Sequence, residues 1–179
     1  MTGGQRVIVG VTGSVGNLQA LRYAAAEARR RETGLVAVHA WVPPGGDLAE
    51  RRFPLPELRE VWQEAARSRI QEAFEAALGG PPPGLPVEPV IMRGDAGRAL
   101  VAAASRETDL LVVGAGRRGV LSRLGHRRVS RYCLTHAACP VLVVPASELA
   151  QEMEHRLHAW MVRHRALFPG KDELSGYRG

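Results

Sequence analysis

The chain has 179 residues, which is enough for one ordinary domain and an appendage but short for two. Its hydrophobic share of 45% and charged share of 23% are typical of a globular protein and argue against wholesale disorder. The formal net charge of +6 favours anionic partners, and no apolar run approaches the roughly 20 residues that span a bilayer.

Strand and helix patterns then alternate along the chain. Short β-branched runs ended by glycine or proline predict five buried strands, over residues 6–11, 35–41, 87–92, 110–113 and 141–144. Between them lie helical patterns: one capped by Ser14 and stopped by Gly34, a long one closed by Gly79, one capped by Asp95 and running to about Thr108, and one ending near His136. This alternation predicts an α/β fold with an open five-stranded parallel sheet and helices on both faces.

The composition changes after Pro145. We therefore expect residues 1–146 to form the α/β domain and residues 147–179 to add an amphipathic helix with a polar tail. The apolar stripe of that helix, which includes Met153, Leu157 and Trp160, packs on the protein itself or on the second subunit of a dimer, or else docks a protein partner.

The two cysteines, Cys133 and Cys139, have neither the number nor the spacing of a disulfide framework or a zinc site. The first residues also lack the pattern of a signal peptide. These features predict a cytoplasmic protein with reduced thiols.

Ligands bind open parallel sheets at the carboxyl ends of the strands, where the strand order reverses. The loops after the first and fourth strands are therefore the places to look. The first, within Val9–Ser14, is a small-residue turn before a helix, so it is either a phosphate-facing turn or an ordinary helix cap. The second, Gly114–Gly119, matches G-x-G-x-x-G, but it lies in the fourth βα unit and no acidic residue follows at dinucleotide spacing, which argues against a Rossmann fingerprint.

Arginines are concentrated around the second loop. Cations near a helix N-terminus oppose the helix dipole, and guanidinium groups match phosphate oxygens, so an anion between them is one interpretation. A solvated basic face or an intersubunit ion pair is the other. The cluster comprises Arg117, Arg118, Arg123, Arg127, Arg128 and Arg131.

No catalytic residue can be assigned, because no Ser-His-Asp, paired-carboxylate or Walker-lysine spacing occurs. His155 and His158 lack a third metal ligand, so no metal is predicted. Nucleic acid is not favoured either, since the basic charge comes without an aromatic platform.

Several segments in order resemble the universal stress protein family. They are Val9–Ser14, His39, Gly94-Asp95, Asp109–Gly114, Val129-Ser130, Leu134–His136 and Cys139–Val144, and the resemblance covers Arg6 to Pro145. It implies a doubly wound, adenine-nucleotide alpha-hydrolase-like domain with a role in the stress response, and a homodimer formed through the Val141–Val144 edge strand. One branch of the family binds ATP or AMP. The nucleotide- or phosphate-binding positions expected here are Val11, Thr12, Gly13, Ser14, Ala40, Gly94, Gly114, Gly116, Arg117, Gly119, Arg127, Arg128, Val129 and Ser130.

The chain departs from the ATP-binding pattern of that branch, which has an aspartate after the first strand and then G-x-x-G, nine residues and G-S/T. Thr12 replaces the aspartate, Arg117 the second glycine, and Arg127 and Arg128 the Gly-Ser pair. Arginine side chains remove the room that glycine gives a phosphate. Three interpretations stay open: an adapted pocket for a phosphate-bearing anion, an interaction module with a vestigial pocket, and a recruited enzyme acting on a phosphorylated metabolite.

Overall fold

The structure is a computed structural model that describes residues 4–12, 15–43, 56–115, 126–146 and 156. The chain divides into two compact units, Met1–Ala146 and Ser147–Gly179. The predicted C-terminal helix lies outside the described residues apart from Arg156, so its packing or docking stays a prediction.

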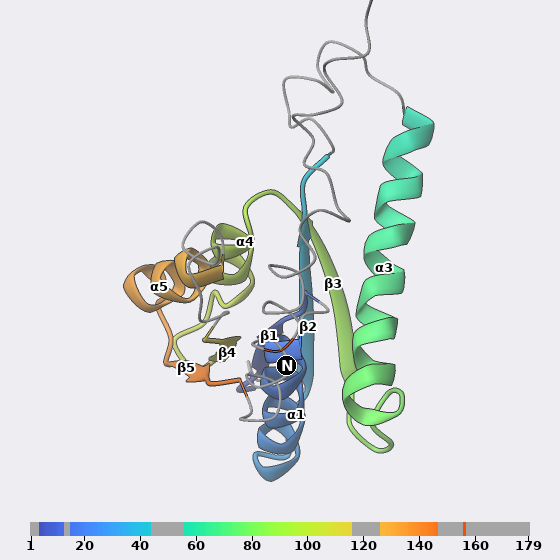
Figure 1. The fold of residues 1–179 in the computed structure, drawn as a ribbon. Helices are drawn as coiled ribbons and strands as arrows, with labels where there is room; N and C mark the ends of the chain where they lie inside the picture. Colours follow the sequence, from blue (N-terminus) through green and yellow to red (C-terminus); the bar gives the residue numbers. More distant parts are fainter. Residues whose placement is uncertain (1–3, 13–14, 44–55, 116–125, 147–155, 157–179) are drawn as a thin grey trace, which may run out of the picture. The chain divides into compact units, whose positions relative to one another are not determined.

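The first unit alternates strands and helices (Figure 1). The elements, in chain order, are β1 (Val7–Gly10), α1 (Val15–Arg30), β2 (Leu35–Trp41), α3 (Pro56–Leu78), β3 (Val87–Arg93), α4 (Ala96–Ala103), β4 (Leu110–Gly114), α5 (His126–His136) and β5 (Val141–Val144).

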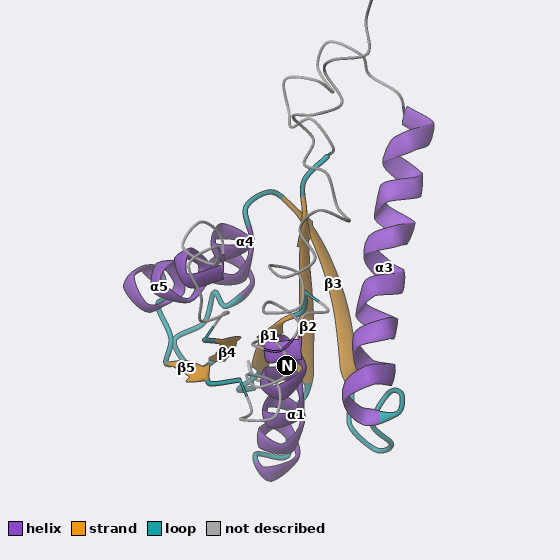
Figure 2. Ribbon diagram, in the orientation of Figure 1, coloured by secondary structure: helices purple, strands orange, loops and turns teal. Residues whose placement is uncertain are grey.

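All neighbouring strands are parallel, and their spatial order is β3-β2-β1-β4-β5 (Figure 2). The order reverses at β1, because β2 and β3 follow one another on one side of β1, and β4 and β5 lie on its other side. The predicted open five-stranded α/β sheet is therefore confirmed.

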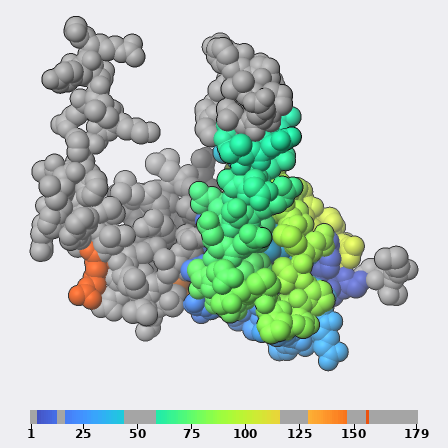
Figure 3. All heavy atoms as spheres, turned by 90° about the vertical axis from the view of Figure 1, so that its right-hand side faces the viewer, coloured from blue at the N-terminus to red at the C-terminus, as the bar shows by residue number. Residues whose placement is uncertain are grey.

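The two faces of the sheet are covered by different helices. Val7, Val9 and Ala37 belong to a buried cluster with residues of α1 and α3, whereas Ile8 and Val38 belong to a second cluster with residues of α4 and α5. Successive residues of a strand point to opposite faces, so continuous β-branched runs fill both clusters. Figure 3 views the molecule from the side of α3, which forms the outer surface of the first face.

Two helix ends differ from the prediction. Gly34 does not end α1; instead Glu32 adopts a left-handed φ of 51°, and Thr33 N–H donates to Ala28 C=O at 2.9 Å. Glu32 occupies a position where glycine is usual, so no residue type in the sequence indicated this turn. Gly79, with a φ of 73°, ends α3 as predicted.

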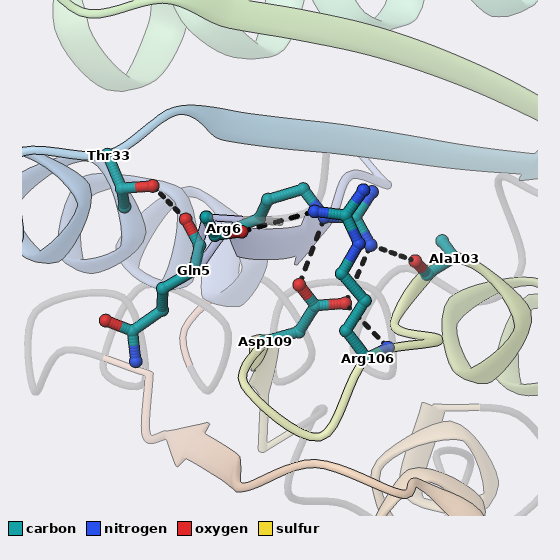
Figure 4. A network of polar contacts seen from close by, with 7 residues as sticks. Gln5, Arg6, Thr33, Ala103, Arg106 and Asp109 are labelled. Atoms are coloured by element: carbon teal, nitrogen blue, oxygen red, sulfur yellow. Dashed lines mark hydrogen bonds and ion pairs between the residues drawn. The ribbon is translucent and has the colours of Figure 1, made fainter. Parts of the chain in front are cut away.

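The second difference is that α4 ends at Ala103 and not near Thr108. The chain after it turns because the Asp109 carboxylate accepts hydrogen bonds from the Arg106 backbone N–H at 3.0 Å and from the Arg6 side chain at 3.0 and 2.7 Å (Figure 4). Arg6 also donates to Ala103 C=O at 3.2 Å. This network ties β1 to the turn that precedes β4, at the amino end of the sheet.

Candidate functional site

The candidate site lies at the carboxyl end of β1, where the strand order reverses. The pairing of β1 stops early on both sides: the register with β2 ends at Gly10↔Val38, and the register with β4 ends at Val9↔Val112. Both neighbours run further, β2 to Trp41 and β4 to Gly114. Beyond these pairs, the main chains of β2 and β4 have no further pairing with β1, and this interruption of the strand pairing is called the gap.

Two side chains hydrogen-bond to the carbonyl groups of Gly10, the last residue of β1, and of Val11, which follows it. Asn17 Nδ2 donates to Gly10 C=O at 2.5 Å, and His39 Nδ1 lies 2.7 Å from Val11 C=O. A carbonyl oxygen only accepts, so His39 Nδ1 carries the proton of this hydrogen bond. Both side chains are buried, with relative exposures of 8% for Asn17 and 9% for His39.

The backbone N–H groups of the turn after β1 are also engaged within the chain. Val11 N–H donates to Val38 C=O at 2.8 Å, and Thr12 N–H donates to Asn17 Oδ1 at 2.8 Å. Neither group is directed to a ligand in this arrangement. Gly13 and Ser14, the other expected positions of this turn, lie outside the described residues.

Ala40 presents its main chain to the gap. In a strand, the N–H and C=O groups of alternate residues point to the same side. Val38 C=O bonds to β1 and Trp41 C=O bonds to Gly94 on the β3 side, so the Ala40 groups point toward β1, beyond its last residue. The site thus has one donor and one acceptor from β2.

Gly114 is the counterpart of Ala40 on β4. Leu110 N–H bonds to Arg6 of the β1 side and Ala115 N–H bonds to Val144 of β5, so the Gly114 groups point toward β1 by the same alternation. Its C=O accepts a hydrogen bond from Ser130 Oγ at 2.7 Å. Ser130 is buried on α5, one residue after the half-buried Val129, and it anchors this helix to the end of β4.

Gly94 borders the same edge of the sheet after β3. Its φ is 125°, a left-handed value that favours glycine, and its N–H donates to Trp41 C=O at 2.8 Å. Asp95 then caps α4 by accepting from the N–H groups of Gly97 at 3.0 Å and Arg98 at 3.2 Å. The predicted cap is confirmed, and its carboxylate is occupied with that role.

The arginine loop can be followed only in part. Arg127 and Arg128 belong to the first turn of α5, which has no acidic residue, but their side chains are outside the described part. Gly116, Arg117 and Gly119 lie outside it altogether. The positive end of the α5 dipole and two cationic residues therefore follow β4 without a neutralising acid in that turn.

Sequence reasoning did not single out Asn17, and it noted His39 only within the family resemblance. A signal for Asn17 was present, because asparagine is disfavoured in helix interiors, but in the first turn of a helix its side chain can hydrogen-bond to nearby backbone groups. The signal for His39 was weaker, since its partner Val11 is 28 residues away and the pairing depends on the register of β1 with β2.

Two further observations concern the described ranges only. Within them, no three His, Cys, Asp or Glu side chains are grouped so as to hold a metal ion. None of the helices there combines the length and hydropathy that a membrane span needs.

The order of the strands, with its reversal at β1, defines a domain of the open, doubly wound α/β class. More specifically, the chain belongs to the universal stress protein family, whose model matches residues 4–145. The predicted family is confirmed.

Relatives and solved structures agree with this assignment. The chain is 34% identical over 141 residues to universal stress proteins of Mycobacterium tuberculosis (strain ATCC 25618 / H37Rv) and Mycobacterium bovis. The match covers 79% of this chain but 45% of each relative, so the chain spans about half of their length.

The fold resembles a universal stress protein crystallised in complex with cAMP, with a TM-score of 0.53 and 26% identity over 80% of this chain and 98% of that chain. It also resembles the universal stress protein UspA from Lactobacillus plantarum, with a TM-score of 0.57 and 21% identity over 78% of this chain and 97% of that chain. The second likeness concerns the fold alone.

Proposed function

We propose that this chain binds an adenine nucleotide or another phosphate-bearing anion at the carboxyl ends of β1, β2 and β4, as a regulatory protein of the stress response. The observation that carries the proposal is the direction of the Ala40 N–H and C=O groups, which face the gap beyond β1. A similar universal stress protein is known in complex with cAMP, which supports a nucleotide as the class of ligand.

Ala40 supplies a donor and an acceptor side by side, and this pair is complementary to the edge of a nucleobase, which also carries both. A phosphate would then lie toward α5. Its helix dipole and the residues Arg127 and Arg128 favour an anion there, because charge-assisted hydrogen bonds are the strong ones. In the adapted pocket, arginine forks replace the close backbone approach that glycine gives.

The test is isothermal titration calorimetry of the native protein and an Arg127→Gly/Arg128→Ser double variant with ATP, AMP and cAMP. An adapted pocket binds at least one of these ligands in the native protein, and the double variant weakens it by about tenfold or more, since each charged hydrogen bond contributes about 1.5–3 kcal/mol. The control is Arg67→Ser/Arg69→Ser on the exposed side of α3, which removes the same charge far along the chain from α5. Equal weakening by the control would show a net-charge effect only.

The second candidate is an interaction module with a vestigial pocket. It is favoured by one observation: the N–H groups of Val11 and Thr12 already donate to Val38 C=O and Asn17 Oδ1 within the chain. Its signature is a native protein that binds none of the three nucleotides, and a double variant, with or without Thr12→Asp, that binds ATP. Tight magnesium-dependent ATP binding by the native protein that the double variant leaves unchanged would contradict both candidates, because the departures from the motif would then have no effect.

We also propose a homodimer formed through β5. Pro140 C=O and Val144 C=O bond to β4, so the N–H and C=O groups of Val141 and Val143 point away from it, to the outer edge of the sheet. No other strand pairs with this edge in the described part of the chain. Such an edge recruits a second strand readily, and a two-fold axis would make the pairing reciprocal.

We place this function in the cytoplasm, where free nucleotides and reduced thiols occur together. Cys133 and Cys139 are both free and buried, in agreement with a protein that needs no disulfide.

A further inference from the structure

Where the pairing of β1 ends, its last carbonyl groups accept hydrogen bonds from side chains. A regular parallel ladder would continue with a hydrogen bond from Ala40 N–H to Val11 C=O. The register ends one step earlier, at Gly10↔Val38, and Val11 C=O accepts from His39 Nδ1–H instead. The imidazole thus occupies the acceptor that Ala40 N–H would otherwise use.

The same replacement occurs on the other side of β1. A continued ladder would join Gly114 N–H to Gly10 C=O. The register with β4 ends at Val9↔Val112, and Gly10 C=O accepts from Asn17 Nδ2 at 2.5 Å. Side chains from two different elements, Asn17 of α1 and His39 of β2, therefore hydrogen-bond to the two carbonyl groups that would otherwise continue the pairing of β1 with its neighbours.

Hydrogen bonds and burial fix the positions of Asn17 and His39. Asn17 uses its whole amide, because Oδ1 accepts from Thr12 N–H while Nδ2 donates to Gly10 C=O. His39 follows Leu35 and Ala37 on the face of the sheet that α1 and α3 cover, and it is buried there. Burying a polar side chain costs free energy unless its hydrogen bonds are made, and the hydrogen bonds of Asn17 and His39 are made to the end of β1.

We propose that Asn17 and His39 are positioning residues that keep the N–H groups of Ala40 and Gly114 directed at the gap, ready to donate to an acceptor-bearing ligand. This inference rests on the proposed nucleotide function and names the two residues that prepare its main-chain donors. Without them, the free N–H groups would extend the sheet by one bond on each side, and the ligand would have to compete with that bond.

The test compares single-residue amide hydrogen exchange of the free protein and of the protein with AMP. In the native protein, AMP should slow exchange at Ala40 and Gly114 by roughly tenfold, the factor that one net hydrogen bond contributes. Gly79 provides the internal control, because its N–H donates to Glu75 C=O at the end of α3 in the free protein. Its exchange should not respond to AMP.

Three variants separate positioning from simple stabilisation. His39→Leu removes the donor, so Val11 C=O should accept from Ala40 N–H; the Ala40 amide becomes protected without ligand, and AMP affinity falls about five- to tenfold. His39→Asn keeps an N–H donor at the place of Nδ1 and should restore native exchange and affinity. Asn17→Asp keeps the acceptor for Thr12 N–H but cannot donate to Gly10 C=O, so only the Gly114 amide should become protected.

The proposal is overturned if AMP binds and slows neither amide, if both amides are already protected in the free native protein, or if His39→Leu changes neither Ala40 exchange nor AMP affinity. Should His39→Leu not fold, the native exchange and the His39→Asn and Asn17→Asp variants still decide. A native protein that binds no nucleotide would contradict the nucleotide form of the proposed function, on which this inference rests. The exchange of the free proteins, measured without ligand, would then test the capture of the two carbonyl groups by itself.

Discussion

The ion pair at the amino end of the sheet provides a quantitative test of what holds β1 against β4. Asp109 is completely buried, with a side-chain exposure of 0%, while its partner Arg6 is 24% exposed and lies 2.7 Å away (Figure 4). The perturbations are Asp109→Asn and Arg6→Gln, singly and together. Removing one partner of a buried pair costs about 3–5 kcal/mol, because the other charge is left uncompensated.

The two single changes should not cost the same. Arg6→Gln strands a carboxylate in the interior, and we expect a loss of about 4 kcal/mol in the free energy of unfolding. Asp109→Asn leaves the Arg6 guanidinium without its carboxylate, but this group can still reach water. The variant weakens two charged hydrogen bonds of about 1.5–3 kcal/mol each, and water partly replaces them, so we expect a loss of about 3 kcal/mol in the free energy of unfolding. The double variant should cost about 2 kcal/mol less than the sum, which is the coupling of the pair.

The assay is urea unfolding followed by circular dichroism, with the slope of the free energy against urea checked for constancy. The matched control is Arg67→Gln, whose partner Glu64 is exposed; that pair, 3.1 Å apart, should contribute less than about 0.5 kcal/mol. Losses below 1 kcal/mol for both single changes at the buried pair, or an additive double variant, would refute the reasoning.

The same pair has a defined pH dependence. Burial alone would raise the pKa of Asp109, but hydrogen bonds from the Arg6 side chain and the Arg106 backbone, together with their charges, bring that pKa below its ordinary value. A lowered folded-state pKa means that the stabilisation is fully present above the unfolded pKa of about 3.9 and is lost as the pH falls through the folded pKa. The stability difference between native protein and Asp109→Asn should therefore be constant above about pH 5 and shrink below about pH 4.

Three further predictions concern other parts of the fold. Val143→Pro removes an outward N–H of β5, so sedimentation should show monomers, and the melting temperature should stay near the native value. Leu142→Pro, in contrast, breaks the ladder with β4 and should unfold the domain. A dimer that persists in Val143→Pro would place the interface elsewhere. A Cβ at Gly97 would lie 2.9 Å from Tyr132 Cδ1, so Gly97→Ala should cost about 1–3 kcal/mol in a Tyr132 background and much less beside Tyr132→Ala. Burial, with the nearby Asp95 charge, raises the pKa of the Cys133 thiol to about 11, so a thiol reagent at pH 8 should leave Cys133 unmodified in the folded protein and modify it in urea.

The sequence was most informative where burial alone decides the structure. The run Leu35–Trp41 and the run Val141–Val144 are strands with the predicted limits, because β-branched residues between turn residues have few other ways to be buried. It was least informative where one side chain far along the chain decides. The end of α4 depends on Asp109 and Arg6, whose separation of 103 positions no local pattern reveals.

The candidate site shows the same division. Its location followed from the reversal of strand order, and the glycine after β3 and the Asp95 cap could be read from residue types. The roles of Asn17 and His39 could not, because they depend on which carbonyl groups lack a partner in the finished sheet. That information is in the register, and a single sequence does not contain it.

A last prediction follows from treating the main-chain and side-chain parts of the pocket separately. The direction of the Ala40 groups depends on the register of β2 and, in our proposal, on His39, and not on Arg127 or Arg128. These two arginines, which are among the departures from the family's ATP-binding motif, concern the side where a phosphate would lie. Adenosine, which has the base but no phosphate, should therefore bind equally well to the native protein and to the Arg127→Gly/Arg128→Ser variant, while AMP should lose about tenfold or more in the variant. Calorimetry with both ligands measures this difference. Equal losses for adenosine and AMP would show that the arginines shape the whole pocket, and the division into a main-chain base site and an arginine phosphate site would be wrong.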